Sequence, residues 1–198
     1  MRFKEIVKKS AADVQMNTAM VLEDKISKGI KGEVFIKAYD YAQGGKLVFE
    51  HNHSNIIVNT SSLLIARLLK DSSEPQNGIA YLALGSGSED WDAATLLDPP
   101  APTTSQTRLL REFYRKAIDS STFVHPQTGE PTSSITNIVD YCVTFGEGEA
   151  VGPIVELGLF GGDGTDEINS GTMFNWLTFP VVSKTSRMVI NIIVRITT

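Results

Sequence analysis

The stretch that constrains the fold most strongly is an alternating pattern near the end of the chain, in residues 186–198. Its apolar positions recur at every second residue, at Met188, Ile190, Ile192, Val194 and Ile196. Successive side chains of a strand point to opposite faces, so this spacing predicts a strand with one face in a core. The opposite face is mostly polar, but Val189 and Ile193 interrupt it. We expect a loop or a neighbouring subunit to cover these two side chains.

Further strands are predicted wherever β-branched and aromatic residues gather between glycine and proline turns. These stretches are residues 32–41, 46–53, 79–84, 108–124, 135–145, 154–160 and 171–180. The paired glycines in residues 42–45 favour a hairpin turn between the first two. Short strands separated by such turns are typical of a sandwich or barrel. We therefore expect a mainly β fold, an antiparallel β-sandwich or barrel-like domain over residues 32–198.

Two helices are expected beside these strands. Residues 63–69 predict one internal helix, and Leu64, Ile65, Leu68 and Leu69 would give it an apolar face that plugs the β core. Residues 1–31 predict an N-terminal helical segment or arm. Its thin apolar stripe includes Phe3, Ile6 and Val7. Such a helix lies either on its own domain or against another subunit that buries the stripe.

The charge balance limits the classes of partner. The net charge is -5 and the sequence pI is about 5.2, which argues against direct nucleic-acid binding. No Lys or Arg occurs between Lys116 and Lys184, whereas the N-terminal segment is rich in lysine. This asymmetry either helps like copies dock head to tail or simply keeps the surface hydrated.

The sequence gives no sign of secretion or of membrane contact. No apolar run has the length of a signal peptide, and no stretch approaches the ~20 apolar residues of a spanning helix. The single cysteine, Cys142, excludes an internal disulfide and argues for synthesis in a reducing compartment. It falls within a predicted strand, which favours a buried structural thiol over a nucleophile.

No pattern of titratable residues predicts an active site. His51 and His53 lie two apart on a predicted strand and could hold a metal, but spacing offers no third ligand, so surface histidines are the simpler interpretation. The turn at residues 163–169 is rich in oxygen ligands, but its spacing does not match an EF-hand. The glycines of residues 85–88 lack the lysine of a phosphate-binding loop. We expect no catalytic residues, no metal and no cofactor.

The order of motifs in the rest of the chain resembles a widespread group of virion structural proteins of tailed bacteriophages, found around necks, tails and fibre attachments. The resemblance covers residues 56–198, and Trp176 stands where a basic residue is expected in that group. It rests on residues 57–59, 81–87, 98–103, 110–116, 143–150, 154–160, 171–175 and 179–185.

The resemblance implies a non-enzymatic, multicopy virion component, made in the cytoplasm of the bacterial host. We expect a homo-oligomeric ring at the neck or collar of the head–tail junction, in contact with portal, connector, tail or fibre proteins. The alternative is a baseplate or tail-fibre adaptor that contributes to host attachment, with Trp91 and the proline-rich loop exposed for binding. The expected interface residues are Phe3, Ile6, Val7, Trp91, Val189 and Ile193.

Overall fold

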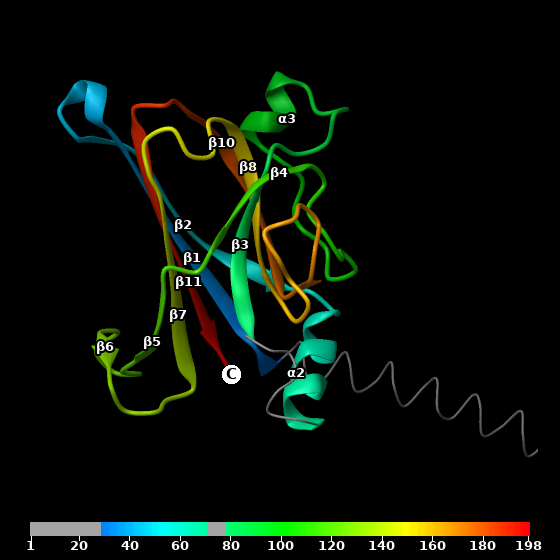
Figure 1. The fold of residues 1–198 in the computed structure, drawn as a ribbon. Coiled ribbons are helices and arrows are strands. Elements are labelled where there is room, and N and C mark those ends of the chain that lie inside the picture. The colour runs from blue at the N-terminus through cyan, green and yellow to red at the C-terminus, as the bar shows by residue number, and fades with distance from the viewer. Residues whose placement is uncertain (1–28, 71–77) are drawn as a thin grey trace, which may run out of the picture.

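The computed structural model describes residues 29–70 and 78–198, arranged as Figure 1 shows. The predicted N-terminal segment, with Phe3, Ile6 and Val7, lies outside these residues. Strands dominate the described chain. They are β1 (Lys31–Asp40), β2 (Lys46–Ile57), β3 (Ile79–Gly85), β4 (Glu112–Ala117), β5 (Ser120–Val124), β6 (Pro131–Thr132), β7 (Ile138–Phe145), β8 (Gly152–Gly161), β9 (Thr172–Met173), β10 (Asn175–Lys184) and β11 (Met188–Thr197).

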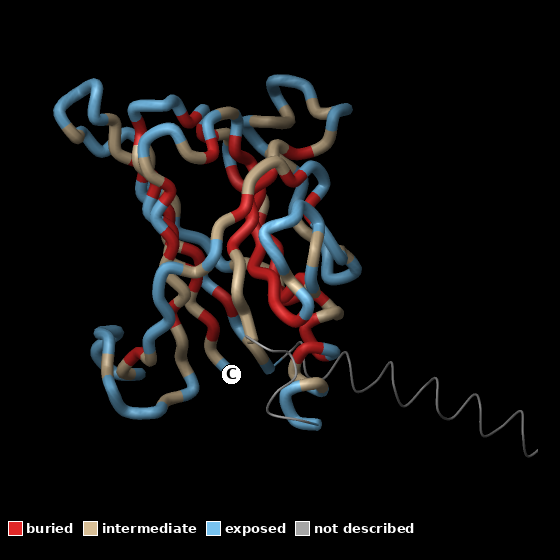
Figure 2. Tube along the Cα trace, in the orientation of Figure 1, coloured by how far each residue is buried: buried red, intermediate tan, exposed pale blue. Residues whose placement is uncertain are grey.

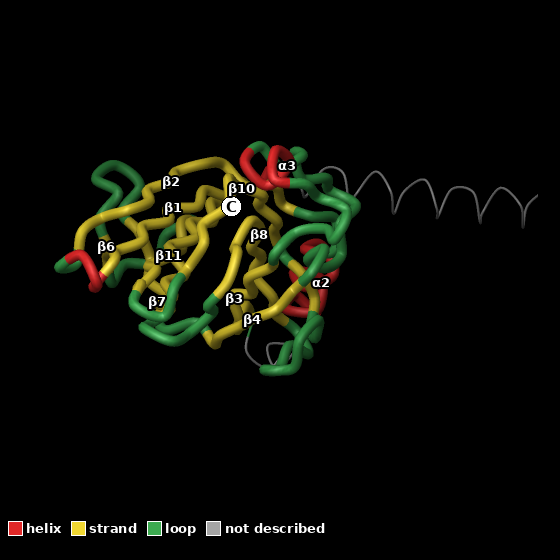
Figure 3. The backbone as a smooth tube through the Cα atoms, turned by 90° about the horizontal axis from the view of Figure 1, so that it is seen from above, coloured by secondary structure: helices red, strands yellow, loops and turns green. Residues whose placement is uncertain are grey.

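The strands form two antiparallel layers that face each other (Figure 3). The first layer has the order β2-β1-β11-β7-β5-β6, and the second has the order β4-β3-β8-β10, with β9 added to β8. A short 3-10 turn, η1 (Tyr41–Gln43), closes the predicted hairpin between β1 and β2. On one side the layers join where β10 pairs with the end of β2, with Asn175 opposite Ile57 and Trp176 opposite Ile56.

The layers also join on the opposite side, at a corner between β4 and β5. The sequence predicts one strand over residues 108–124, and the structure divides it here. Ile118 N–H donates to Ala80 O of β3 at 2.9 Å, and Asp119 N–H donates to Cys142 O of β7 at 3.0 Å. Neighbouring residues thus pair with different layers, so the backbone of the corner stays hydrogen-bonded. Joined on both sides, the sandwich is barrel-like, and the predicted fold class is confirmed.

The core between the layers follows the predicted alternation. All five predicted core positions of β11 are buried, from 0% exposure at Val194 to 7% at Met188. In Figure 2 the buried segments run along the strands, and the connections at both ends are exposed. Burying one such side chain stabilises a fold by roughly 1.5–3 kcal/mol. The alternation read from the sequence therefore marks the elements that hold the sandwich together.

The internal helix exists, but only Leu64 and Ile65 of its predicted apolar face pack against the core. Helix α2 (Ser61–Lys70) lies beside one end of the sandwich (Figure 1). Of the four residues of the predicted apolar face, only Leu64 is fully buried, against Gly161 and Gly162. Leu68 is 44% exposed and Leu69 is 83% exposed. A helix at the end of a sandwich meets the core through about one turn, so most of its apolar face stays outside.

A second short helix, α3 (Ala93–Leu97), lies in a connection for which the sequence predicts no element. Asp92 caps its N-terminus: Oδ1 accepts the Thr95 N–H at 2.8 Å and the Thr95 hydroxyl at 2.7 Å. These hydrogen bonds lower the pKa of the Asp92 carboxyl. The Asp-x-x-Thr spacing is the signal that sequence reasoning missed, because a helix of five residues shows no period.

The connection that carries α3, residues 86–111, contributes to a second apolar cluster that is separate from the core between the layers. Leu157 and Leu159 of β8 belong to the main core, as their alternation predicts, while Phe160 belongs to the second cluster. The members of that cluster are Val58, Ala83, Leu109, Phe160, Met173 and Trp176.

A buried carboxylate, that of Glu156 in β8, ties this connection to the second layer. Oε1 accepts the N–H groups of Arg111 at 3.0 Å and Gly87 at 3.3 Å. Oε2 accepts the Leu110 N–H at 3.0 Å and the indole N–H of Trp176 at 2.9 Å. Glu156 is 0% exposed, so these four donors replace its hydration. The glycine-rich turn at residues 85–88 therefore donates to a carboxylate of its own chain.

Candidate binding seam

A seam opens in the sheet where β2 and β10 separate. After the two pairs that join them, residues 46–55 of β2 and 177–184 of β10 diverge, and no other described strand pairs with this edge of β2. A hollow of about 480 Å³ lies between them. Thr178 Oγ1 donates to Pro100 O at 2.8 Å and holds the proline loop, residues 98–102, beside it. The lining residues are His51, His53, Ser54, Asp98, Pro99, Pro100, Ala101, Pro102, Leu177, Thr178, Phe179 and Pro180.

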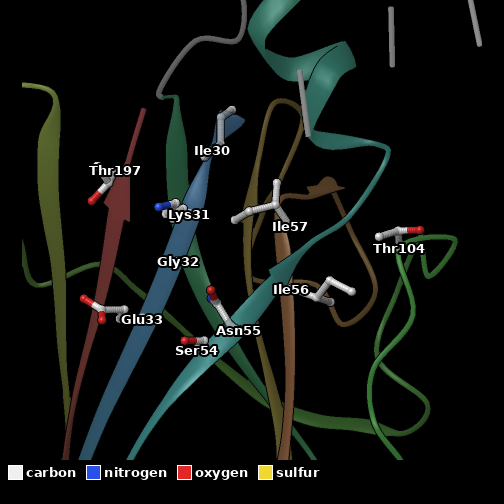
Figure 4. A pocket seen from close by; sticks show the side chains of 10 residues that line it. All are labelled: Ile30, Lys31, Gly32, Glu33, Ser54, Asn55, Ile56, Ile57, Thr104 and Thr197. Carbon is white, nitrogen blue, oxygen red and sulfur yellow. The ribbon is translucent and has the colours of Figure 1, made fainter. Parts of the chain in front are cut away.

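A second hollow, of about 420 Å³, adjoins the first through Ser54, which lines both. Figure 4 shows it between the start of β1 and the end of β2, with the Asn55 side chain directed towards β1. Ile30, close to the start of the described chain, lines it as well. The other lining residues are Lys31, Gly32, Glu33, Asn55, Ile56, Ile57, Thr104 and Thr197.

Polar side chains occupy the inward face of β2 along the seam. Residues that stand opposite each other on paired strands share a face of the sheet. On β1 this face carries the core residues Ala38, Ile36 and Val34, and also Gly32. Opposite them on β2 stand Phe49, His51, His53 and Asn55. Core-facing positions of a two-layer sheet are normally apolar, whereas three successive positions of this row are polar, with His51 and Asn55 half-buried and His53 exposed.

The row is a stack of rings. The His51 and His53 rings are parallel within 3°, with centroids 5.6 Å apart, and His51 also lies 5.9 Å from the Phe179 ring across the seam. His53 Nδ1 is 2.7 Å from Ser54 O. Face-to-face stacking keeps the two imidazoles from converging on one ion. Over the described ranges, no group of three or more His, Cys, Asp or Glu side chains is placed to hold a metal.

Three buried polar atoms along this row have no hydrogen-bond partner among the described residues. They are His51 Nε2 and both amide atoms of Asn55, Oδ1 and Nδ2. The Asn55 amide lies directly over Gly32, where a β-carbon would collide with Oδ1. A buried polar atom left unpaired costs about 1–3 kcal/mol, so a ligand that hydrogen-bonds these atoms would recover that energy.

His51 should make the stability of the seam depend on pH. Burial, and secondly the neighbouring His53, lower the pKa of His51. Because the pKa of His51 is lower in the folded state than in the unfolded state, the unfolded chain binds more protons at acidic pH. The folded state is therefore destabilised relative to the unfolded state as the pH falls below about 6.5. We expect the thermal midpoint of His51→Phe to fall less than that of the wild type between about pH 7.5 and pH 5.5. His53→Asn, which leaves the half-buried His51 ring in place, should retain most of the wild-type pH dependence. An unchanged difference in His51→Phe would contradict the assignment.

The predicted interface residues lie on different parts of the molecule. Trp91 is half-buried, and its ring lies against Gly87, whose φ of +76° and missing side chain make room for it. Val189 and Ile193 are half-buried on the outer face of β11, in the other layer. The structure therefore does not bring Trp91 together with Val189 and Ile193. Sequence reasoning missed Asn55 and Phe179; the one available signal was that β2 shows no clean apolar face.

Val189 and Ile193 belong to an apolar strip on the outer face of the first layer. Ile193 stands opposite Phe35 on one side and Cys142 on the other, and Val189 stands opposite Tyr39. All five are half-buried. Cys142 was expected to be buried; burial nevertheless raises the pKa of its thiol and so disfavours the thiolate.

Ion pairs flank the apolar strip on both sides. Arg195 Nε donates to Asp140 Oδ1 at 2.7 Å, and the guanidinium lies 5.5 Å from the Phe35 ring. Lys37 and Glu50 pair at 3.2 Å. An apolar centre with a polar rim is the composition of a protein–protein interface.

The oxygen-rich turn at residues 163–169 is organised around a guanidinium. Arg115 Nη1 donates to Thr165 O at 2.9 Å and to Ser170 O at 3.0 Å, while Nη2 donates to Glu112 Oε2 at 2.9 Å. The guanidinium also lies 4.8 Å from the Phe160 ring. The carbonyl oxygens of Thr165 and Ser170 thus already accept hydrogen bonds from the positively charged Arg115 side chain.

No known protein-family model matches the chain, and no curated protein sequence is significantly similar to it. In the described part of the chain, no helix is long and apolar enough to span a membrane.

Proposed function

We propose that this protein is a non-enzymatic structural component of a tailed-phage virion, assembled as a multicopy ring at the neck or collar of the head–tail junction. Its partners would be further copies of itself and neighbouring portal, connector, tail or fibre proteins. It would be made in the bacterial cytoplasm and reside in the virion. The ordered motifs of residues 56–198 support this proposal from the sequence.

The observation that carries the proposal is the apolar strip on the outer face of the first layer. Phe35, Tyr39, Val189 and Ile193 occupy the solvent side of adjacent strands, where polar residues are the rule. All four side chains are half-buried on this outer face, so the strip can meet a neighbouring copy. When the strip of one copy contacts a different surface of the next copy, the same contact can repeat from copy to copy. Such a series closes into a ring when the rotation between neighbouring copies closes.

Changing Ile193 to lysine should weaken assembly and leave the fold nearly intact. The charge would be buried in an interface core, where it has no partner, but stays at the surface of a single copy. We expect a clear loss of oligomer in sedimentation velocity, with a change in unfolding free energy below about 1 kcal/mol. Thr107→Lys, the same charge on the exposed connection of the other layer, is the matched control. Equal oligomer in both variants would contradict the role of the strip.

Position in the particle requires labelled virions. Gold or antibody label directed at this protein should appear at the head–tail junction in electron micrographs. Label confined to the distal tail would instead favour the baseplate or tail-fibre adaptor.

The proline loop beside the seam supports that second possibility, because it presents three prolines next to aromatic rings. Specific binding of the purified protein to host cells would support the adaptor, and its absence over a range of concentrations would count against it.

A further inference from the structure

We infer that the apolar strip of one copy receives the arm of a neighbouring copy, with Ile135 of the arm seated on the centre of the strip. The arm is residues 125–137, the connection that runs from β5 through β6 to β7. This inference rests on the proposed multicopy assembly and names the second surface that a head-to-tail contact needs. The occupant of the strip is therefore a second copy of this chain.

The first argument is the exposure of the arm. It projects from the end of the first layer, where β6 is the last strand (Figure 1). Most of its residues are exposed, and Ile135 is 87% exposed. Among the described residues no other large apolar side chain is as exposed, and the next, Leu69 of α2, reaches 83%. The arm thus presents one large apolar side chain to a neighbouring molecule.

The second argument is that hydrogen bonds hold the arm in place next to this isoleucine. The Thr136 hydroxyl donates to Val124 O at 2.9 Å and accepts the Ile138 N–H at 3.2 Å. Asn137 O accepts the Thr198 N–H at 3.0 Å, and Asn137 Nδ2 donates to Thr198 O at 2.7 Å. Single exposed apolar residues are common on protein surfaces. One on a loop held in this way loses little conformational freedom when it docks, which favours binding.

The turn of the arm is held as well, and by a residue that flanks the strip. Gly129 N–H donates to His125 O at 2.8 Å, and Gly129 O accepts from Arg195 Nη2 at 3.1 Å. Arg195 also pairs with Asp140 at the rim of the strip. The arm and the strip of one copy therefore keep a fixed relation. A contact that repeats from copy to copy closes into a ring only when that relation is constant.

The third argument is complementary chemistry. Residues 131–137 of the arm contain no Asp, Glu, Lys, Arg or His. Their Ser and Thr hydroxyls can hydrogen-bond the ion-paired rim, while Ile135 matches the apolar centre of the strip. Docking the arm would bury no unpaired charge, so the desolvation of an ion does not oppose it. The arm and the strip match as apolar centre against apolar centre, with polar groups around both.

The fourth argument is the placement of the two surfaces on the first layer. The arm lies at the β6 end of the strand order, and β2 is the last strand at the other end. Leu47 of β2 stands opposite Tyr39 of the strip and is 40% exposed, so apolar side chains continue to that other end. A contact between the arm of one copy and the strip of the next therefore joins two different surfaces of the same layer. Such a contact is head-to-tail, as a ring requires.

Complementary charges test the contact in the full-length protein. Ile135→Asp and Ile193→Lys should each raise the concentration needed for half-assembly about tenfold or more in sedimentation velocity, because each buries a lone charge. The double variant should recover much of the assembly, since the two charges then face each other across the copies. Ile168→Asp, the same change at an isoleucine that is 48% exposed in a loop of the other layer, is the matched control and should assemble like the wild type.

Disulfide formation tests the same contact directly, in a Cys142→Ser background. One full-length protein carries Ile135→Cys, and a second, tagged protein carries Tyr39→Cys or Val189→Cys in the strip. Mixed and oxidised, they should give a disulfide-linked heterodimer on a denaturing gel for at least one of the two positions. Glu167→Cys, on an exposed loop of the other layer, replaces Ile135→Cys as the control and should give none.

The outcomes separate this contact from the proposed function. Normal assembly of Ile135→Asp together with loss of assembly in Ile193→Lys would overturn the arm as occupant and leave the strip as an interface. Failure of the double variant to recover would overturn the seating of Ile135 against Ile193. A link from Ile135→Cys to His53→Cys, and to neither strip position, would place the arm in the seam and overturn the stated contact. A wild-type chain that stays monomeric at every concentration would overturn both proposals.

Discussion

Replacing Glu156 with alanine should lower the free energy of unfolding by roughly 3–5 kcal/mol, among the largest effects of any single change in this chain. The carboxylate accepts four hydrogen bonds and is fully buried. Alanine would leave four donors unpaired, including the indole N–H of Trp176, and would leave a cavity beneath the connection of residues 86–111. Urea denaturation at one low protein concentration measures the loss free of changes in assembly.

Glu156→Gln separates the hydrogen-bonding role from the volume of the side chain. The amide keeps the shape and one acceptor oxygen, but its NH₂ group would face two donors, so we expect a loss smaller than that of alanine yet clearly measurable. Glu167→Ala, which removes an exposed carboxylate, should change stability by less than about 0.5 kcal/mol. If Glu156→Ala behaved like Glu167→Ala, the carboxylate would not fix the connection to the sheet.

Replacing Arg115 with methionine should cost a similar amount, again roughly 3–5 kcal/mol, for a different reason. The side chains of Arg115 and Glu112 are 1% and 0% exposed, and removing the guanidinium leaves a buried carboxylate without its cation. The carbonyls of Thr165 and Ser170 lose their donor at the same time. We therefore expect both a lower unfolding free energy and faster proteolytic cleavage within residues 162–171.

Two further variants test the geometry of this cluster. Arg115→Lys should recover little, because a single ammonium group cannot reach Glu112 and the loop carbonyls together as the planar guanidinium does. The double variant Glu112→Leu with Arg115→Met should recover much of the loss, since it removes the unpaired charge. A double variant as unstable as Arg115→Met would show that the stabilisation comes from the loop contacts and not from the ion pair.

Most strands could be predicted from the sequence because their signal is local. The alternation in residues 186–198 names every buried residue of β11, and the same rule places Leu157 and Leu159 in the main core. The corner at Ile118 and Asp119 could not be predicted in this way. Its residues continue the β pattern on both sides, and only the positions of β3 and β7 decide where pairing passes from one layer to the other.

The buried polar clusters show the same limit. Glu156 stands in an alternating strand, where a carboxylate would normally mark a solvent-facing position. Glu156 is buried because the connection of residues 86–111, which begins about 70 residues earlier in the chain, packs against β8. Backbone N–H groups of this connection donate to the carboxylate. Helix α2 is the converse case. Its apolar face predicted a core position, but only Leu64 and Ile65 reach the core, and Leu68 and Leu69 are exposed.

The sequence by itself determined where most strands lie and which face of β11 is buried, because both depend on the period-two geometry of one extended chain. It also supplied the ordered motifs on which the virion proposal rests. Only the tertiary structure decided that β2 and β10 separate, that His51 and Asn55 face inward without partners, and that the outer apolar strip draws on three strands. These features depend on distances between segments far apart in the chain, which no local pattern specifies.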